Sequence, residues 1–364
     1  MSVKFTDDDP KALFDGIIAS MENELGEILN PGDERRIVAG NILAVAASIN
    51  SSINAMGNAQ LVRYSFGTYL DNLGELWGVT RLPASNATVQ LKFTLAAPAG
   101  TTIIVPKGTR ATPDGELYFA TTQDIIVPFD TTTALVQAEA TQAGIKYNGY
   151  SEGFIKTIVD QSPYVVSVSN TDISCGGSDI EDDESFRMRI KLAPERLSVA
   201  GPRGAYEYWT KTADVNIADV RVYSSAAGQV DVVVLMKDGL NTTQVTIDKV
   251  KNILSDDNIR PLTDNVIVHM PEKISYAISL TYYISQNNAI EEVAIKEKVT
   301  AAIEDYEKWQ RNKLGRAINP DELRRKILNA GADRIVLNTP VFTEISNNQV
   351  GVVSTKNIIY GGLM

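Results

Sequence analysis

The chain has 364 residues, of which 44% are hydrophobic; this is enough for the cores of two or three domains and excludes a disordered chain. Its formal net charge of −11 argues against nucleic-acid binding, because contacts to phosphates need clustered Lys and Arg side chains. One cysteine, Cys175, excludes an internal disulfide. With one histidine, His269, we expect no catalytic triad and no histidine-rich metal site.

The first ten residues, MSVKFTDDDP, are polar and acidic and contain no apolar core of a signal peptide. No apolar run approaches the roughly 18 to 20 residues that a membrane span needs. The sequence therefore predicts a protein that is made and folded in the cytoplasm, without membrane insertion.

Residues 10–79 are predicted to be helical. Two apolar stripes recur at steps of three and four residues, separated by a turn and a new helix cap at 30–33. The first stripe holds Leu13, Ile17, Met21, Leu25 and Ile28, and the second holds Ile42, Ala46, Ile49, Ile53 and Met56. Small residues flank the second stripe, so another helix can approach closely. The helices form either an intramolecular bundle or a contact with another chain. A third stripe, from Phe66 to Trp77, completes the region.

Further along the chain, residues 87–172 alternate apolar and polar positions between Pro and Gly, which predicts antiparallel β structure. Strands are then expected at 220–223, 230–235 and 266–269, with a helix at 242–254. In the last part, strands are expected at 274–284, 334–337, 341–345 and 349–353, with helices at 290–309 and 319–329. The apolar tail at 358–362 is too short to fold alone and is expected to dock onto another surface.

Residues 176–209 are predicted to form a structural junction. Gly176 and Gly177 make a turn, Ser178 or Asp179 caps a helix, and four acidic residues ending at Glu184 favour the positive end of the helix dipole. Basic partners follow at Arg187, Arg189 and Lys191. Phe186, Ile190 and Met188 are expected to face the core, and Pro194 to end a well-capped surface helix.

We expect no enzymatic activity, cofactor or metal. The acidic clusters at 7–9 and 181–184 lie at helix starts, where the dipole and solvation account for them. They also lack the ligand spacing of a calcium loop, and the glycine-rich turns lack the Lys-Ser/Thr of a phosphate loop. Cys175 is expected to be a small buried or loop residue, and His269 a polar residue at a strand end.

Several short motifs occur in an order that resembles the baseplate J-like family of phage wedge proteins. They include Tyr69-Leu70-Asp71, Trp77-Gly78-Val79, the Gly-Gly-Ser-Asp before the acidic helix, Gly204-Ala205-Tyr206 and a strand segment at 219–239. The resemblance covers roughly residues 66–240. It implies a structural wedge subunit that links the central hub of a contractile tail to its sheath and transmits the change that triggers contraction.

The resemblance, with the patterns above, implies an elongated α+β chain with four parts. These are N-terminal helices at 1–82, a β-rich domain at 83–175, an α+β middle domain at 176–270 and a dimerising C-terminal α+β domain at 271–364. The implied partners are a second copy, a companion wedge protein that shares the helix bundle, and the sheath-initiator and hub or spike proteins. The chain would be made in a bacterial host and assembled into a virion tail or tailocin baseplate.

Two alternatives stay open. Paired carboxylates can hydrolyse a glycosidic bond, so an envelope-polymer hydrolase is one of them. A receptor- or glycan-binding tail protein is the other, although exposed aromatic residues are scarce in the β-rich part and Trp is absent between Gly78 and Trp209.

Overall fold

The computed structural model describes residues 3–98, 103–161, 164–198, 201–237, 241–256, 259–261 and 263–364. The predicted α+β class is confirmed. Contacts divide the chain into two compact units, which are described separately below. The first unit combines Met1–Arg81 with Asp182–Lys191, and the second combines Leu82–Glu181 with Leu192–Met364. The predicted junction at 176–209 is therefore divided between the two units. Its residues 199–200 lie outside the described part of the chain, and so do residues 238–239 of the predicted strand segment at 219–239.

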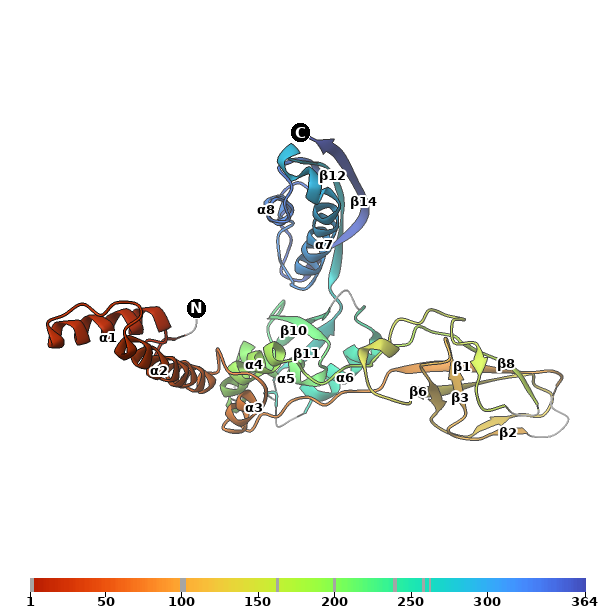
Figure 1. Ribbon diagram of the computed structural model, residues 1–364. Helices are drawn as coiled ribbons and strands as arrows, with labels where there is room; N and C mark the ends of the chain where they lie inside the picture. Colours follow the sequence, from red (N-terminus) through yellow and green to blue (C-terminus); the bar gives the residue numbers. More distant parts are fainter. Residues whose placement is uncertain are drawn as a thin grey trace. The chain divides into compact units, whose positions relative to one another are not determined.

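Four helices build the first unit (Figure 1). They are α1 (Pro10–Leu25), α2 (Glu34–Ala59), α3 (Gly67–Glu75) and α4 (Asp183–Leu192). Asp9 caps α1 by accepting hydrogen bonds from the amides of Lys11 and Ala12, and Asp33 caps α2 by accepting from the amide of Arg35. The three N-terminal helices are thus confirmed where the sequence predicts them.

Helices α1 and α2 pack against each other as a helical hairpin. Leu43 and Ala47 of α2 are buried, as are Ile18 and Leu29 on the opposite side of the contact. The extended segment before α1 is held to α2 by Asn54, whose Oδ1 accepts from the amides of Phe5 (2.8 Å) and Thr6 (3.0 Å). The hairpin therefore has a small core on one face of α2 only.

One helix in the described part of the chain, α2, is long and apolar enough to cross a membrane by length and composition. The sequence analysis expected no such segment, because Asn, Ser and Gly residues interrupt its apolar runs. Core helices of soluble proteins pass the same test.

The β-rich part of the second unit is a six-stranded antiparallel sheet, as predicted, with strand order β7-β3-β4-β6-β1-β8. Its strands are β1 (Thr88–Leu95), β3 (Arg110–Thr112), β4 (Phe119–Thr121), β6 (Thr133–Ala140), β7 (Thr157–Ile158) and β8 (Val165–Asn170). A separate antiparallel pair joins β2 (Ile103–Val105) to β5 (Ile125–Val127). Alternate residues such as Leu91, Phe93 and Phe119 fill one core.

The middle domain has a three-stranded mixed sheet, order β11-β10-β9, with two helices packed on it. Its elements are η2 (Ala193–Leu197), α5 (Arg203–Ala213), β9 (Ile217–Tyr223), β10 (Gln229–Met236), α6 (Gln244–Leu254) and β11 (Asn265–His269). Strand β10 is antiparallel to β9 and parallel to β11. Val232 and Val234 of the central strand are fully buried, together with Leu254 of α6.

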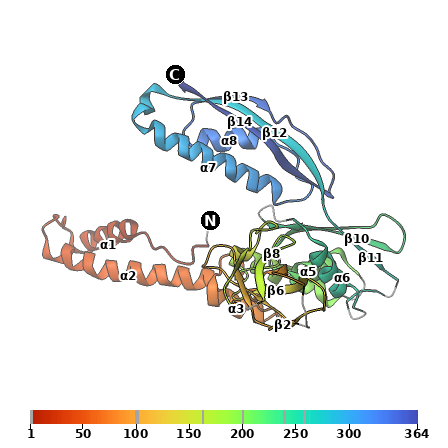
Figure 2. The same cartoon turned by 90° about the vertical axis from the view of Figure 1, so that its right-hand side faces the viewer.

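The C-terminal domain has the sheet order β13-β12-β14, and Figure 2 shows α7 and α8 on one face of that sheet. Its elements are β12 (Glu272–Ile284), η4 (Gln286–Glu291), α7 (Glu292–Arg311), α8 (Pro320–Asn329), β13 (Arg334–Thr339) and β14 (Gln349–Leu363). Pro320 occupies the first turn of α8, as predicted, and Asn319 caps it.

Two predictions for the C-terminal domain are wrong. No strand forms at 341–345: Val341 and Phe342 are 67% and 60% exposed, and a single bridge joins Thr343 to Ile318. The apolar tail at 358–362 is not a segment separate from the strand predicted at 349–353, because both belong to β14, which pairs in parallel with β12 along its length. The polar residues at 354–357 hide this continuity in the sequence.

Candidate functional site: an exposed apolar stripe and a polar pocket

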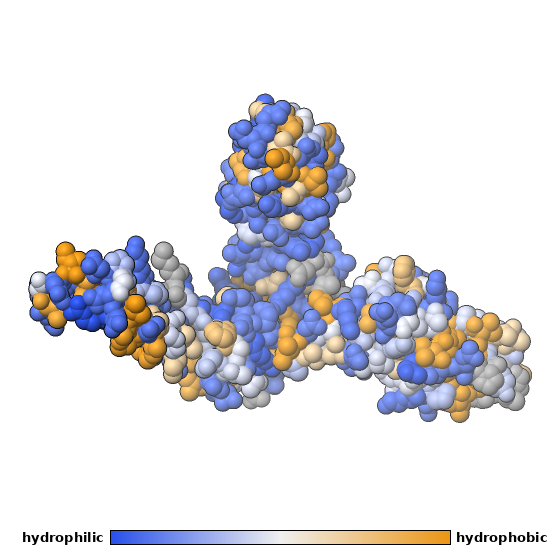
Figure 3. Space-filling model, in the orientation of Figure 1, coloured by the Kyte–Doolittle hydropathy of each residue, from blue (hydrophilic) through white to orange (hydrophobic). Residues whose placement is uncertain are grey.

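The apolar stripe is defined as nine of the ten residues in the two predicted stripes, since the tenth, Ile28, lies beyond the end of α1. It contains Leu13, Ile17, Met21 and Leu25 of α1 with Ile42, Ala46, Ile49, Ile53 and Met56 of α2. On α2, Ile42, Ile49 and Met56 are 64%, 54% and 67% exposed. Ile17 and Leu25 of α1 are also exposed, whereas Leu13, Met21 and Ala46 are half-buried. Figure 3 shows apolar side chains at the surface of the hairpin.

The face of α2 that packs within the unit is a different one. It carries Ala39, Leu43 and Ala47. A groove of about 500 Å³ adjoins it, lined by Ile17, Met21, Glu34, Arg35, Val38, Ala39, Ile42 and Leu43. Contiguous apolar surface that is left open to water in this way is typical of a protein or membrane contact. The described residues of the first unit leave most of the stripe uncovered.

Helix α4 is fixed within the first unit by its arginines. The guanidinium of Arg187 donates to the carbonyls of Val62 (2.8 Å) and Ser65 (2.6 Å) and pairs with Glu184. Arg189 donates to the carbonyl of Thr80 (2.6 Å). Because both arginines are at least nine-tenths buried, α4 is not the surface helix that was predicted, although Arg187 does pair with an acidic residue of the same helix.

Two further details of α4 also differ from the prediction. Its N-terminus is capped by Asp182, whose Oδ1 accepts from the amide of Ser185 (2.9 Å), and not by Ser178 or Asp179. Phe186 and Ile190 are buried as expected, but Met188 is 47% exposed. The fold places Arg81 over the ring of Phe186 and in ion pairs with Asp71 and Asp183, a cluster that no local motif signals.

The other three junction residues belong to the second unit. The carbonyl of Gly177 accepts hydrogen bonds from the amide side chains of Asn148 (2.7 Å) and Asn216 (3.0 Å). A Cβ at Gly177 would lie 2.5 Å from the carbonyl oxygen of Gly144, so no side chain fits. Gly176 has a left-handed φ of 87°, and Asp179 accepts from the amide of Ile145. Of the predicted junction residues, Gly176, Gly177 and Asp179 thus lie in the second unit, and Glu184, Arg187 and Arg189 in the first.

His269, Asp231 and Ser225 meet at one end of the middle sheet. Both His269 Nε2 (2.7 Å) and Ser225 Oγ (2.5 Å) contact the Asp231 carboxylate. All three residue types of a triad therefore come together here, although a single histidine in the sequence predicts none. The geometry still differs from a triad, because the carboxylate and not the imidazole lies between the other two groups. His269 ends β11, as predicted.

Burial alone would raise the pKa of Asp231. Hydrogen bonds from Ser225, His269 and Gln229 outweigh it and hold that pKa at about 2. Burial, together with the nearby carboxylates of Asp172 and Asp214, raises the pKa of the half-buried Cys175 thiol, so its surroundings are not the electropositive ones of a reactive cysteine. In the described ranges, no group of three or more His, Cys, Asp or Glu side chains is arranged to hold a metal ion.

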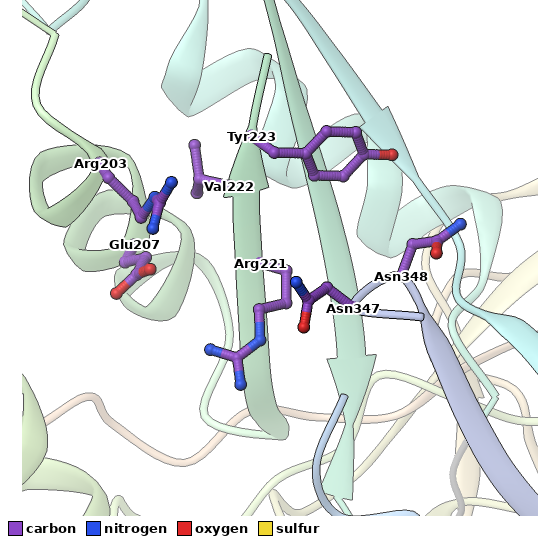
Figure 4. Close-up of a pocket in the computed structure, with 7 residues that line it drawn as sticks. All are labelled: Arg203, Glu207, Arg221, Val222, Tyr223, Asn347 and Asn348. Carbon is purple, nitrogen blue, oxygen red and sulfur yellow. The ribbon is translucent and has the colours of Figure 1, made fainter. Parts of the chain in front are cut away.

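A polar pocket lies between the middle and C-terminal parts of the second unit (Figure 4). Arg203 and Glu207 project from α5, while Arg221, Val222 and Tyr223 belong to β9. Asn347 and Asn348 come from the segment before β14. The sequence analysis missed this site, because its residues come from three separate segments and no spacing within any of them signals it.

Family comparisons give the class of protein. Residues 90–177 match the barrel domain of baseplate J-like proteins, and residues 198–270 match the central domain of the same proteins. The chain thus contains two domains of the baseplate J-like family, at residues 90–177 and 198–270.

The chain is similar to "Baseplate protein J" of Escherichia phage P2, with 29% identity over 188 residues. That match covers 50% of this chain and 60% of the relative. Among solved structures, one chain of the anti-feeding prophage (AFP) baseplate aligns with a TM-score of 0.44 and 12% identity, over 94% of this chain and 90% of that one.

Proposed function

We propose that this chain is a structural subunit of a baseplate in a contractile tail or related injection particle. The family comparisons support this role, since two regions of the chain match the barrel and central domains of baseplate J-like proteins. The single observation that carries the proposal is the apolar stripe, which the described part of the first unit leaves exposed. A subunit that works by assembly needs such a surface, whereas a monomeric protein seldom retains one.

Within the baseplate, we propose the position of a wedge subunit that links the central hub to the sheath. The helical hairpin would bundle with a second copy and a companion wedge protein through the apolar stripe. Other surfaces would contact the sheath-initiator and the hub or spike proteins. The role is mechanical: reorientation of the wedges would license contraction, which requires interfaces that repack between two states.

The C-terminal domain is the proposed contact between wedges. Strand β14 is at the edge of its sheet, since β12 is its one partner among the described strands. An edge strand of 15 residues offers a row of unpaired backbone groups to a second copy. Synthesis in the cytoplasm of a bacterial host, followed by assembly into a tail or tailocin baseplate, completes the proposal.

Light scattering of the purified full chain, alone and after co-expression with its genomic neighbours, tests the proposal. We expect a stable complex that contains at least one second protein. A monomer that ignores every neighbour would contradict it. A monomer that also floats with liposomes would identify α2 as a membrane-binding helix instead.

A further inference from the structure

The pocket of Figure 4 has a volume of about 560 Å³, which is within the range of roughly 300–1,000 Å³ typical of ligand sites. Five of its seven lining side chains can donate hydrogen bonds: Arg203, Arg221, Tyr223, Asn347 and Asn348. Glu207 is the single carboxylate among them. The lining thus suits a ligand that supplies acceptor oxygens.

Arg221 is poorly satisfied by the protein itself. Its Nε is buried and has no hydrogen-bond partner in the described structure. Its Nη2 lies 3.5 Å from the carbonyl of Leu314 and 3.8 Å from Asp219 Oδ2. That carboxylate oxygen already accepts a shorter bond of 3.0 Å from the Leu314 amide. Burial closes Nε to solvent, but the Arg221 side chain is 34% exposed overall, so an acceptor from outside would approach the Nη atoms, whose contacts within the protein are long.

Arg203 adds a second positive charge in an unfavourable place. It is the first residue of α5, whose first turn contains no acidic residue and whose N-terminus has no side-chain cap. A cation is destabilising at that end of a helix dipole, and an anion is stabilising. Glu207, one turn further on, is half-buried, and burial raises the pKa of its carboxyl. Two guanidiniums therefore line the pocket with one carboxylate, and the second carboxylate nearby, Asp219, lies 3.8 Å from Arg221 and accepts its shorter bond from Leu314.

We propose that this pocket binds a carboxylate on an aliphatic stem, namely a Glu or Asp side chain of an acidic segment in a neighbouring protein. The planar guanidinium fork of Arg221 matches a carboxylate in two parallel hydrogen bonds. Val222 and the ring of Tyr223 line the same pocket and suit the methylene stem. Glu207 competes with the incoming carboxylate for the two guanidiniums and so limits the affinity of the pocket for that ligand. The proposal goes beyond the role in assembly and does not depend on the apolar stripe.

Calorimetric titration of the full chain with the peptide Ac-Glu-Glu-Glu-Glu-NH₂, at about 50 mM salt where screening is modest, tests the site. Arg221→Gln should weaken binding about tenfold, because a charged hydrogen bond is lost. Arg203→Gln, at an exposed helix end, should weaken it less. Glu207→Gln should tighten binding about threefold by removing the competitor. Arg110→Gln, which breaks an exposed pair with Asp160 in the barrel, is the matched control and should change nothing.

Four results would overturn the proposal. They are no measurable heat with the acidic peptide, equal binding of Ac-Gln-Gln-Gln-Gln-NH₂, tighter binding of inorganic phosphate, or equal affinity of the Arg221→Gln and Arg110→Gln variants. Circular dichroism of each variant shows whether it is folded. Since the titration needs no partner protein, its failure leaves the assembly role untouched.

Discussion

Arg187 offers the sharpest test of how the first unit is held together. The side chain is 8% exposed and donates to the carbonyls of Val62 and Ser65, in a segment more than 120 positions earlier in the chain. A hydrogen bond from a charged group contributes about 1.5–3 kcal/mol, so Arg187→Met, which keeps the stem, should lower the free energy of unfolding of this unit by about 3–5 kcal/mol.

Glu184→Gln is the matched control, because it removes the third partner of the same guanidinium. Glu184 is 83% exposed, and an exposed ion pair contributes at most about 1 kcal/mol. Trp77 lies in the first unit, whereas Trp209 and Trp309 lie in the second. Urea unfolding followed by Trp77 fluorescence, in a Trp209→Phe/Trp309→Phe background, therefore reports on the first unit. Equal losses for the two variants would refute the claim that Arg187 fixes α4 through the two carbonyls.

Two further predictions concern the second unit. Gly177→Ala should lower the melting temperature by several degrees, because its Cβ would meet the Gly144 carbonyl. The control is Gly32→Ala, where an added Cβ meets nothing within 4 Å. Equal melting temperatures for the two variants would contradict this prediction. The depressed pKa of Asp231 contributes stability above its unfolded value of about 4, which is lost as pH falls toward 2. Asp231→Asn should therefore be less stable at pH 7 and lose less stability between pH 4 and 2 than the wild type; parallel urea-unfolding curves for both proteins over that range would show the reasoning to be wrong.

Local signals in the sequence predict most elements of the fold. The caps at Asp9 and Asp33 and the apolar spacing place α1 and α2, and alternation places the antiparallel strands. Local signals cannot choose which face of α2 is buried, because Leu43 on one face and Ile42 and Ile49 on another are equally apolar. They also misassign α4, where several acidic residues compete for one cap and where distant carbonyls, supplied by the tertiary fold, bury the arginines.

The same limit applies to the candidate sites. The residues of the apolar stripe could be predicted from their spacing alone, since each half of the stripe lies on a single helix. The polar pocket could not, because Arg203, Arg221 and Asn347 meet only after a helix, a strand and a distant loop have packed together. The parallel pairing of β14 with β12 is likewise a contact between segments about 77 residues apart, and nothing within either segment signals it.

Co-purification of tagged variants with the co-expressed neighbouring proteins tests the central claim most directly. Ile49→Asp places a charge in the apolar stripe, and Ser51→Asp places the same charge on the same helix, about 200° around its axis. Both positions are exposed, so neither change should unfold the isolated chain. We predict that Ile49→Asp loses the companion proteins while Ser51→Asp retains them. Retention of the full complex by Ile49→Asp would contradict the assignment of the stripe as the assembly interface.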